Sequence, residues 1–121
     1  MKTYIEVNGE RYEATITGRV RDKEWGDRES KSIRIKMDYH DARGLFVENM
    51  EWAILCEREV EKQIEDEEGN ITTETVIEYD RFENSEFSMV GDLTDHRNGY
   101  VTVKMGKPTA EELLAILSEV L

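Results

Sequence analysis

Hydrophobic and polar residues alternate along most of this chain, which is the pattern of β-strands with one buried face and one solvated face. Two such runs meet at Asn8-Gly9, a dipeptide that favours a two-residue type I′ hairpin loop. This loop places Ile5 opposite Tyr12, and the apolar side chains of both runs then share one face. A third alternating run spans residues 32–39. The pattern therefore predicts three strands in the first third of the chain.

The longest alternating segments, residues 51–65 and 71–82, surround the turn-forming sequence Glu67-Glu68-Gly69-Asn70 and predict a long β-hairpin. If the apolar side chains of the two strands share one face, the loop contains either all four of these residues or only Gly69-Asn70, and the sequence leaves both registers open. The outer half of the hairpin is rich in Glu, Asp, Lys and Thr, so it cannot be packed on both faces. At about 3.3 Å per residue it is expected to project beyond the body of the domain.

A further hairpin is expected within residues 87–105. Its turn is predicted to be a three-residue loop, Arg97-Asn98-Gly99, in which Gly99 adopts the left-handed conformation. This loop gives the cross-strand pairs Leu93–Val103 and Gly91–Met105.

Two segments depart from strand alternation and predict helices. The spacing between His40 and Asn49 suits a short helix that begins near His40 or Asp41, although Gly44 weakens it. Near the C-terminus, Thr109 to Glu112 has the capping-box sequence, so a longer helix is expected to start at Thr109. Apolar residues then recur at three- and four-residue steps on one face: Leu113, Leu114, Ile116, Leu117, Val120 and Leu121.

We expect this apolar helix face to cover the inward side of the sheet and to close the hydrophobic core. Leu113, Leu117 and Val120 should then be among the most buried side chains. The sheet residues expected beneath the helix are Ile16, Ile35, Met89, Val101 and Val103. The alternative is that the helix packs on another subunit, in which case the isolated protein exposes this face.

The elements together predict an α+β fold that is mainly β. It comprises an antiparallel sheet, sandwich or partly open barrel of about seven strands, a long projecting hairpin, one short helix and a C-terminal helix packed on the sheet. The 121 residues are enough for one hydrophobic core and too few for two, so residues 1–121 are expected to form a single domain.

Charge and composition narrow the range of partners. The formal net charge is −12 at pH 7, which argues against binding to nucleic acid or to anionic membranes, because both require a basic surface. No apolar run approaches the roughly 20 residues of a membrane span. Cys56 is the only cysteine, so neither an internal disulfide nor a cysteine-based zinc site is expected. These features predict a cytoplasmic protein from a reducing compartment.

Candidate catalytic chemistry is sparse. His40 and His96 each adjoin an acidic residue, but no serine or cysteine nucleophile in a recognisable elbow accompanies them, so surface-turn roles are favoured. The acidic sequence 65–70 lacks the ligand spacing of a calcium-binding EF-hand loop and is interpreted as a solvated hairpin tip. No phosphate-binding or dinucleotide-binding motif occurs. We therefore expect no enzymatic activity, no cofactor and no bound metal.

Residues 21–30 combine dense charge with no periodicity and predict a loop with Trp25 at its centre. This tryptophan is expected either to fold back as a lid on the sheet edge or to stand out as an anchor for a partner. The remaining candidates for partner contact lie at the hairpin tip: Glu65, Asp66, Glu67, Glu68, Asn70 and Thr72.

Residues 16–31, 90–99 and 101–109 resemble the corresponding segments of small uncharacterised proteins encoded in prophages of gut Firmicutes, and the likeness runs nearly from end to end. The resemblance implies a phage genomic setting. The expected layout is also similar to that of phage tail-tube and related virion proteins, in which a β-sandwich or barrel has one packed helix and a projecting hairpin.

These observations lead to two main functional hypotheses, and an enzyme that acts through the Asp95-His96 and Asp41 groups is the third. The first is a non-enzymatic phage structural or accessory protein, associated with the tail, that contacts other virion subunits or further copies of itself in the host cytoplasm or in the virion. The second is an acidic inhibitor that imitates nucleic acid and occupies a host DNA-binding enzyme, as the net charge of −12 suggests.

Overall fold

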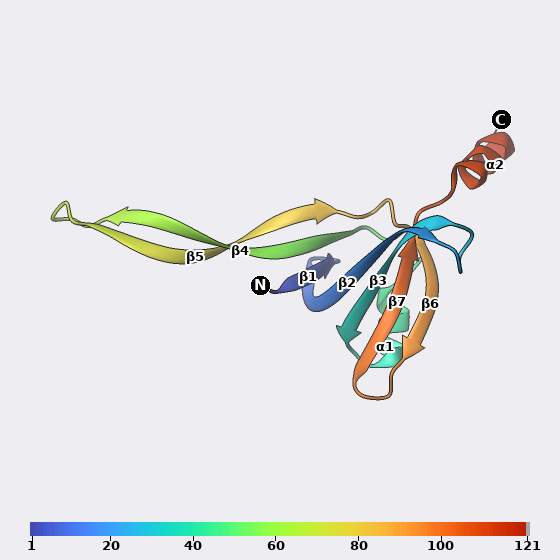
Figure 1. Cartoon of the computed structure of the whole chain (residues 1–121), viewed down its shortest axis with the longest axis horizontal. Coiled ribbons are helices and arrows are strands. Elements are labelled where there is room, and N and C mark those ends of the chain that lie inside the picture. Colours follow the sequence, from blue (N-terminus) through green and yellow to red (C-terminus); the bar gives the residue numbers. More distant parts are fainter. Residues whose placement is uncertain (121) are drawn as a thin grey trace.

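The computed structural model describes residues 1–120, and within this range seven strands form one antiparallel sheet in the order β5-β4-β1-β2-β3-β7-β6 (Figure 1). The sheet is open, with β5 at one edge and β6 at the other. The predicted mainly-β fold is therefore confirmed. The elements are β1 (Thr3–Val7), β2 (Glu10–Asp22), β3 (Arg28–Lys36), α1 (Tyr39–Leu45), β4 (Trp52–Glu65), β5 (Ile71–Glu83), β6 (Met89–Asp95), β7 (Tyr100–Gly106) and α2 (Ala110–Val120).

Local turn chemistry sets the pairing of β1 with β2. Asn8 and Gly9 have φ angles of 53° and 80°, which is the left-handed conformation that a type I′ loop requires. Ile5 therefore pairs with Tyr12, as the sequence predicts.

The third strand differs from the prediction at both of its ends. β3 begins at Arg28 and ends at Lys36, whereas the alternating pattern was expected to run over residues 32–39. Its end is set by α1, because the Asp38 side chain accepts a hydrogen bond from the His40 amide at 3.1 Å and caps the helix.

The core lies on one face of the sheet, where α1 and the segments around Trp52 and Phe87 cover it. The Trp52 indole Nε1 donates to the Phe87 carbonyl at 3.1 Å, and the two rings meet edge to face. Beneath them, side chains from the three strands β1, β3 and β7 are fully or almost fully buried: Ile5, Val7, Ile33, Ile35, Val101 and Val103.

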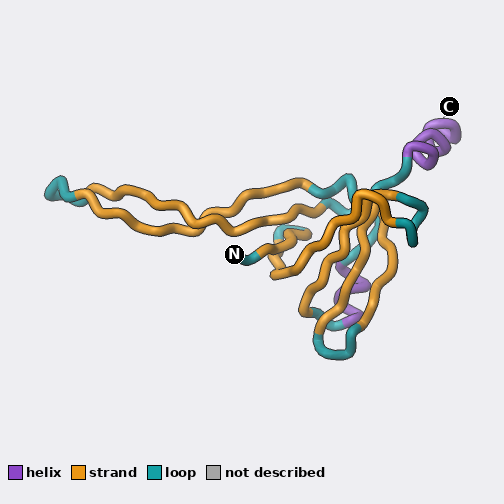
Figure 2. The backbone as a smooth tube through the Cα atoms, viewed as in Figure 1, coloured by secondary structure: helices purple, strands orange, loops and turns teal. Residues whose placement is uncertain are grey.

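The prediction that α2 closes this core is wrong. Figure 2 shows α2 leading away from the sheet, and its apolar side chains are exposed, with 49% of Leu113 and 56% of Leu117 accessible to solvent. The Val120 side chain lies outside the described residues. The predicted capping box does form, since the Thr109 hydroxyl accepts from the Glu112 amide at 3.3 Å and a Glu112 carboxylate oxygen accepts from the Thr109 amide at 3.2 Å.

The connection between β7 and α2 explains the direction of the helix. The Lys107 amide donates to the Glu29 carbonyl at 3.0 Å, and Arg28 donates to the Lys107 carbonyl at 3.1 Å. The same guanidinium forms an ion pair with Glu112 at 2.7 Å. The first turn of α2 is thereby fixed to the end of the sheet, while the rest of the helix extends into solvent.

The β6–β7 hairpin has the predicted three-residue loop. Gly99 is left-handed, with φ of 89°, and Leu93 pairs with Val103. The expected pair Gly91–Met105 is wrong, because an irregularity between Val90 and Leu93 shifts the register so that Val90 pairs with Met105.

Candidate functional site: the projecting hairpin

The β4–β5 hairpin extends far beyond the strand that supports it. Thirteen consecutive pairs, from Ala53–Glu83 to Glu65–Ile71, join its strands without a bulge. Strand β1 pairs with β4 only over residues 52–56. From Arg58 outward the hairpin is therefore a two-stranded ribbon that projects from the sheet (Figure 1). At about 3.3 Å per residue, the eight β4 residues from Arg58 to Glu65 span about 26 Å. We call residues 58–78 the arm.

The observed register differs from both registers that the sequence left open. Glu65 pairs with Ile71, so five residues, 66–70, make the turn. The cause is Asp66, whose carboxylate accepts from the backbone amides of Glu68 at 2.9 Å and Asn70 at 2.8 Å. These bonds lower the pKa of Asp66, with the Asn70 amide as the largest contribution.

This register places apolar residues on both faces of the arm rather than on one. Even-numbered residues of both strands share one face and odd-numbered residues share the other, because each pair of partners has the same parity. The apolar set that includes Val60 and Ile64 therefore lies on the face opposite Ile77 and Tyr79, contrary to the expectation that these residues share a face.

The even-numbered face is largely neutralised by internal ion pairs. Lys62 contacts Glu78 at 2.7 Å, and Arg58 contacts Glu78 at 3.5 Å and Asp80 at 3.4 Å. The pKa of Glu78 is lowered chiefly by its bond to Lys62. These contacts link the two strands along the arm.

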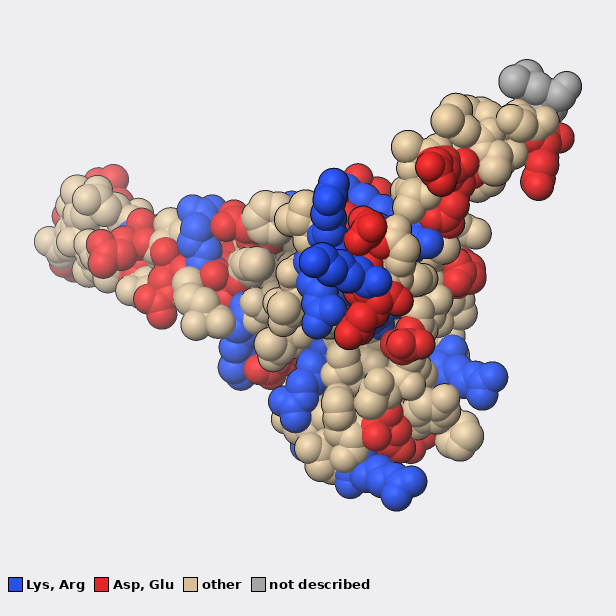
Figure 3. Space-filling model, turned by 45° about the vertical axis from the view of Figure 1, so that its right-hand side comes forward, with Lys and Arg blue, Asp and Glu red and all other residues tan. Residues whose placement is uncertain are grey.

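The odd-numbered face is acidic and partly apolar. On β4, Glu59, Glu61 and Glu65 follow one another at two- and four-residue steps, and within residues 1–120 none of them forms an ion pair. Beside them on β5, 54% of Ile77 and 65% of Ile71 are exposed. Over the whole hairpin, residues 52–83, eleven acidic and three basic residues give a net charge of −8 out of the −12 of the chain (Figure 3).

The base of the arm is fixed to β1 and β2. The Tyr4 hydroxyl donates to Glu57 at 2.8 Å, and the Tyr4 ring meets the Tyr79 ring edge to face at 6.0 Å. The Arg11 guanidinium lies 4.8 Å from the centre of the Tyr79 ring. The hydrogen bond to the Glu57 carboxylate, followed by burial, raises the pKa of Tyr4 to about 12. The arm thus leaves the body at a defined place.

The structure divides the predicted tip residues into two groups. Asp66 and Asn70 hold each other in the turn, and the Thr72 hydroxyl donates to the Ile64 carbonyl at 3.4 Å. Glu65, Glu67 and Glu68 present their exposed carboxylates at the end of the arm. The tip residues therefore lie together, as expected from their sequence.

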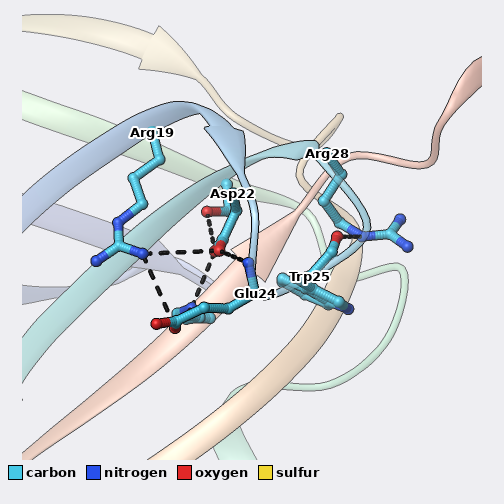
Figure 4. Close-up of polar contacts among 7 residues, drawn as sticks. Arg19, Asp22, Glu24, Trp25 and Arg28 are labelled. Atoms are coloured by element: carbon cyan, nitrogen blue, oxygen red, sulfur yellow. Dashed lines mark hydrogen bonds and ion pairs between the residues drawn. The ribbon is translucent and has the colours of Figure 1, made fainter.

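Trp25 is far from the tip, over the opposite edge of the sheet. Its ring covers Gly91 and Gly106, where an added Cβ atom would come within 2.8 Å and 2.7 Å of ring carbons. Arg28 stacks over the ring at 5.0 Å and donates through Nε to the Trp25 carbonyl at 3.0 Å (Figure 4). These contacts favour the interpretation of Trp25 as a lid.

Beside this lid lies a buried polar cluster that the sequence analysis missed. The Asp22 carboxylate is inaccessible to solvent and accepts from Lys104 at 2.9 Å, from Ser30 at 2.8 Å and from the Glu24 amide at 3.1 Å (Figure 4). The bond to Lys104 is the largest cause of the lowered pKa of Asp22. Within the described residues, no buried side-chain nitrogen or oxygen lacks a hydrogen-bond partner. The cluster therefore fixes the loop around Trp25. The hydrogen bond from the Glu24 amide to the Asp22 carboxylate forms an Asx-turn. An aspartate at the start of a charged loop is the sequence signal that could have predicted this turn.

The remaining candidates for chemistry lie apart. His96 is 2.8 Å from the Thr102 hydroxyl, whereas the His40 ring packs against Tyr39. Within residues 1–120, no group of three or more His, Cys, Asp and Glu side chains is arranged to hold a metal ion. In the same range, no helix combines the length and apolar character of a membrane span.

Comparison with known proteins gives no match to a family model, to a curated protein or to a solved structure.

Proposed function

We propose that this protein is a non-enzymatic phage structural or accessory protein, associated with the tail, that binds protein partners through the β4–β5 hairpin. The observation that carries the proposal is the arm, which has solvent on both faces and places exposed apolar side chains outside the core. Its two ends are well defined, at the Tyr4–Glu57 contact and at the Asp66 turn.

An isolated two-stranded ribbon has little stability of its own, because it cannot bury an apolar face. The arm nevertheless exposes 41% of Ile64 and 54% of Ile77, and at its base 40% of Tyr79 is exposed. A projecting element on which exposed apolar side chains alternate with charged ones is suited to binding a protein partner, which would cover the apolar side chains. Contact with a protein supplies the burial that the arm lacks in the isolated chain.

The phage setting rests on the resemblance of residues 16–31, 90–99 and 101–109 to prophage-encoded proteins. In that setting the partners are other virion subunits or further copies of this chain, in the host cytoplasm or in the virion.

A second candidate function is inhibition of a host DNA-binding enzyme by imitation of nucleic acid. The observation that favours it is the concentration of charge, with −8 of the net charge of −12 on the hairpin. Such binding depends on long-range attraction between opposite charges and weakens steeply as salt is added. Binding to a basic host nuclease that does not change between low and high salt would contradict this function.

The leading proposal is tested by shortening the arm without disturbing its base. Deleting residues 62–65 together with 71–74 removes four residues from each strand, so the turn 66–70 follows the pair Glu61–Thr75 with the alternation of hydrogen-bonded pairs preserved. We expect the variant to fold like the parent and to lose co-purification with its partners from phage-producing cells.

A chain ending at Thr109 is the matched control, because it removes α2, a comparably exposed element. We expect this control to retain the partners. Retention of partners by the shortened hairpin, or their loss with α2 alone, would show that the arm is not the contact element.

A further inference from the structure

The two edge strands of the sheet, β6 and β5, differ in how well they are protected against the addition of another strand. At the β6 edge the strand has only seven residues and its pairing is irregular between Val90 and Leu93. The Val90 amide is occupied by the Glu48 carboxylate at 2.9 Å, and the Asn49 amide donates to the Ser88 carbonyl at 2.8 Å. Short length, a bulge and covering contacts are the means by which proteins prevent strand addition at an edge.

The β5 edge has none of these protections. Strand β5 has thirteen residues, Ile71–Glu83, that contain no proline and no lysine and pair with β4 without a bulge. Its sequence is rich in Thr, Val, Ile and Tyr, which favour extended structure. A long, regular and uncovered edge is a template for another strand.

The hydrogen bonds at the two ends of the hairpin show which backbone groups are free. The Asn84 amide donates to the Trp52 carbonyl at 2.9 Å, and the Asp66 amide donates to the Asn70 carbonyl at 2.9 Å. Both hydrogen bonds join even-numbered residues. Hydrogen-bonded and non-hydrogen-bonded residue pairs alternate along an antiparallel ladder, so the even-numbered pairs of this hairpin are the hydrogen-bonded ones. The odd-numbered residues of β5 therefore direct their N–H and C=O groups away from β4. In the middle of β5 these residues are Thr73, Thr75, Ile77 and Tyr79.

The side chains along β5 define what an added strand would meet. On the even-numbered face of β5 they are Thr72, Glu74, Val76, Glu78, Asp80 and Phe82, and on the odd-numbered face they include the Thr, Ile and Tyr residues just named. Glu78 and Asp80 already contact Lys62 and Arg58, so within residues 1–120 the carboxylate of this stretch that has no ion pair is Glu74. Side chains directly opposite one another on neighbouring strands interact most strongly, and like charges there are destabilising. Basic residues therefore suit one face of the added strand, and β-branched or apolar residues suit the other.

Charge also argues against a second β5 strand as the occupant. Pairing two copies edge to edge would bring together two hairpins that each have a net charge of −8. A basic strand instead reduces the repulsion among the carboxylates of the arm.

We infer that the free edge of β5 binds an extended segment of a basic partner protein, in which Lys or Arg alternates with Thr or Val, as an additional strand of the sheet. This inference rests on the proposed function of the hairpin as a contact arm and specifies its partner and its mode of binding.

The test uses a nine-residue peptide in which Lys alternates with Thr or Val. Its controls are a peptide with Glu in place of each Lys and a peptide of the same composition with the lysines in one block. Amide hydrogen exchange of the full-length protein is followed by NMR. We expect the alternating basic peptide alone to slow exchange at Thr73, Thr75, Ile77 and Tyr79, while the even-numbered amides are already slow in the free protein.

Two substitutions separate backbone pairing from general charge attraction. Thr75→Pro removes an outward N–H and leaves the hydrogen bonds to β4 in place, since proline is tolerated where an edge-strand N–H faces solvent. We expect it to weaken peptide binding about tenfold, the loss that a hydrogen bond of ordinary strength in the ladder produces. Glu74→Lys should weaken binding more than Glu67→Lys, which makes the same charge change in the turn, off the strand edge.

Each outcome of these experiments either supports or overturns strand addition at β5. Equal binding of the acidic and basic peptides, protection elsewhere than on β5, or dimers held together through β5 in the absence of peptide would overturn it. Loss of partners from the shortened arm, combined with no peptide binding at β5, would leave the contact arm standing and exclude strand addition. Peptide binding at β5, combined with partners that survive shortening, would exclude the contact arm and leave the edge as a binding site.

Discussion

The packing of Trp25 over two glycines gives a prediction that can be worked from the structure. In Gly91→Ala, the new Cβ atom would lie 2.8 Å and 2.9 Å from carbons of the Trp25 ring and 3.2 Å from the Lys104 Cβ. Because the ring must shift, we expect a cost of about 1–3 kcal/mol in the free energy of unfolding, the usual penalty for overpacking. Trp25→Ala should cost about 2–4 kcal/mol, toward the lower part of the range for a buried tryptophan, because this residue is largely but not fully buried.

The double variant tests the reasoning directly. Without the Trp25 ring, the two shortest contacts of the alanine at position 91 disappear and the contact with the Lys104 Cβ at 3.2 Å remains, so its cost should fall below about 1 kcal/mol. Urea unfolding followed by far-UV circular dichroism gives the four free energies of the cycle. Gly18→Ala is the matched control, because a Cβ atom there meets nothing within 4 Å and its cost should simply add to that of Trp25→Ala. Costs for Gly91 and Trp25 that add to within about 0.5 kcal/mol would refute the packing.

Three further predictions follow from other contacts. Leu117→Ala should cost less than about 1 kcal/mol in thermal unfolding, because 56% of this side chain is exposed, whereas a large loss would mean that α2 packs on the protein. Asp22 has a lowered pKa in the folded state, so its contribution to stability is present above the ordinary aspartate pKa and is lost as pH falls through the folded pKa. Asp22→Asn should therefore flatten the acid limb of a curve of unfolding free energy against pH, and an unchanged limb would contradict the Lys104–Asp22 pair. Tyr4, with a pKa of about 12, should ionise at higher pH than a free tyrosine in an ultraviolet titration, and Glu57→Gln should bring its pKa back toward 10, an effect whose absence would argue against this hydrogen bond.

Where turn chemistry is local, the sequence was sufficient to predict the pairing. Asn8-Gly9 determined the register of β1 with β2, and Gly99 the loop between β6 and β7, because each requires a left-handed backbone that few residues adopt. The β4–β5 register was missed because the prediction assumed that apolar side chains share a face. That assumption holds only where a core covers one face, and the arm has no core on either side. There the Asp66 side chain decides the register instead.

The error in α2 has a related cause. An amphipathic pattern shows that a helix face can be buried, but it does not say against what. The contacts of Arg28 with Glu112 and with the Lys107 carbonyl, which direct the helix into solvent, join residues about 80 positions apart and have no signature in the sequence. The buried Asp22–Lys104 pair is equally non-local. For the candidate site, the sequence predicted the acidic tip and the projection of the hairpin, whereas the free β5 edge depends on the observed register and strand order.

We propose that the arm is the surface that contacts the partner protein. This proposal is tested most directly by placing a photo-cross-linking amino acid at Ile77, on the arm beside the free edge, and separately at Val20, a body residue that is 84% exposed. After irradiation of phage-producing cells, covalent adducts are identified by mass spectrometry. We expect an adduct with a basic protein from position 77 and none from position 20. Adducts from position 20 with none from position 77 would contradict it.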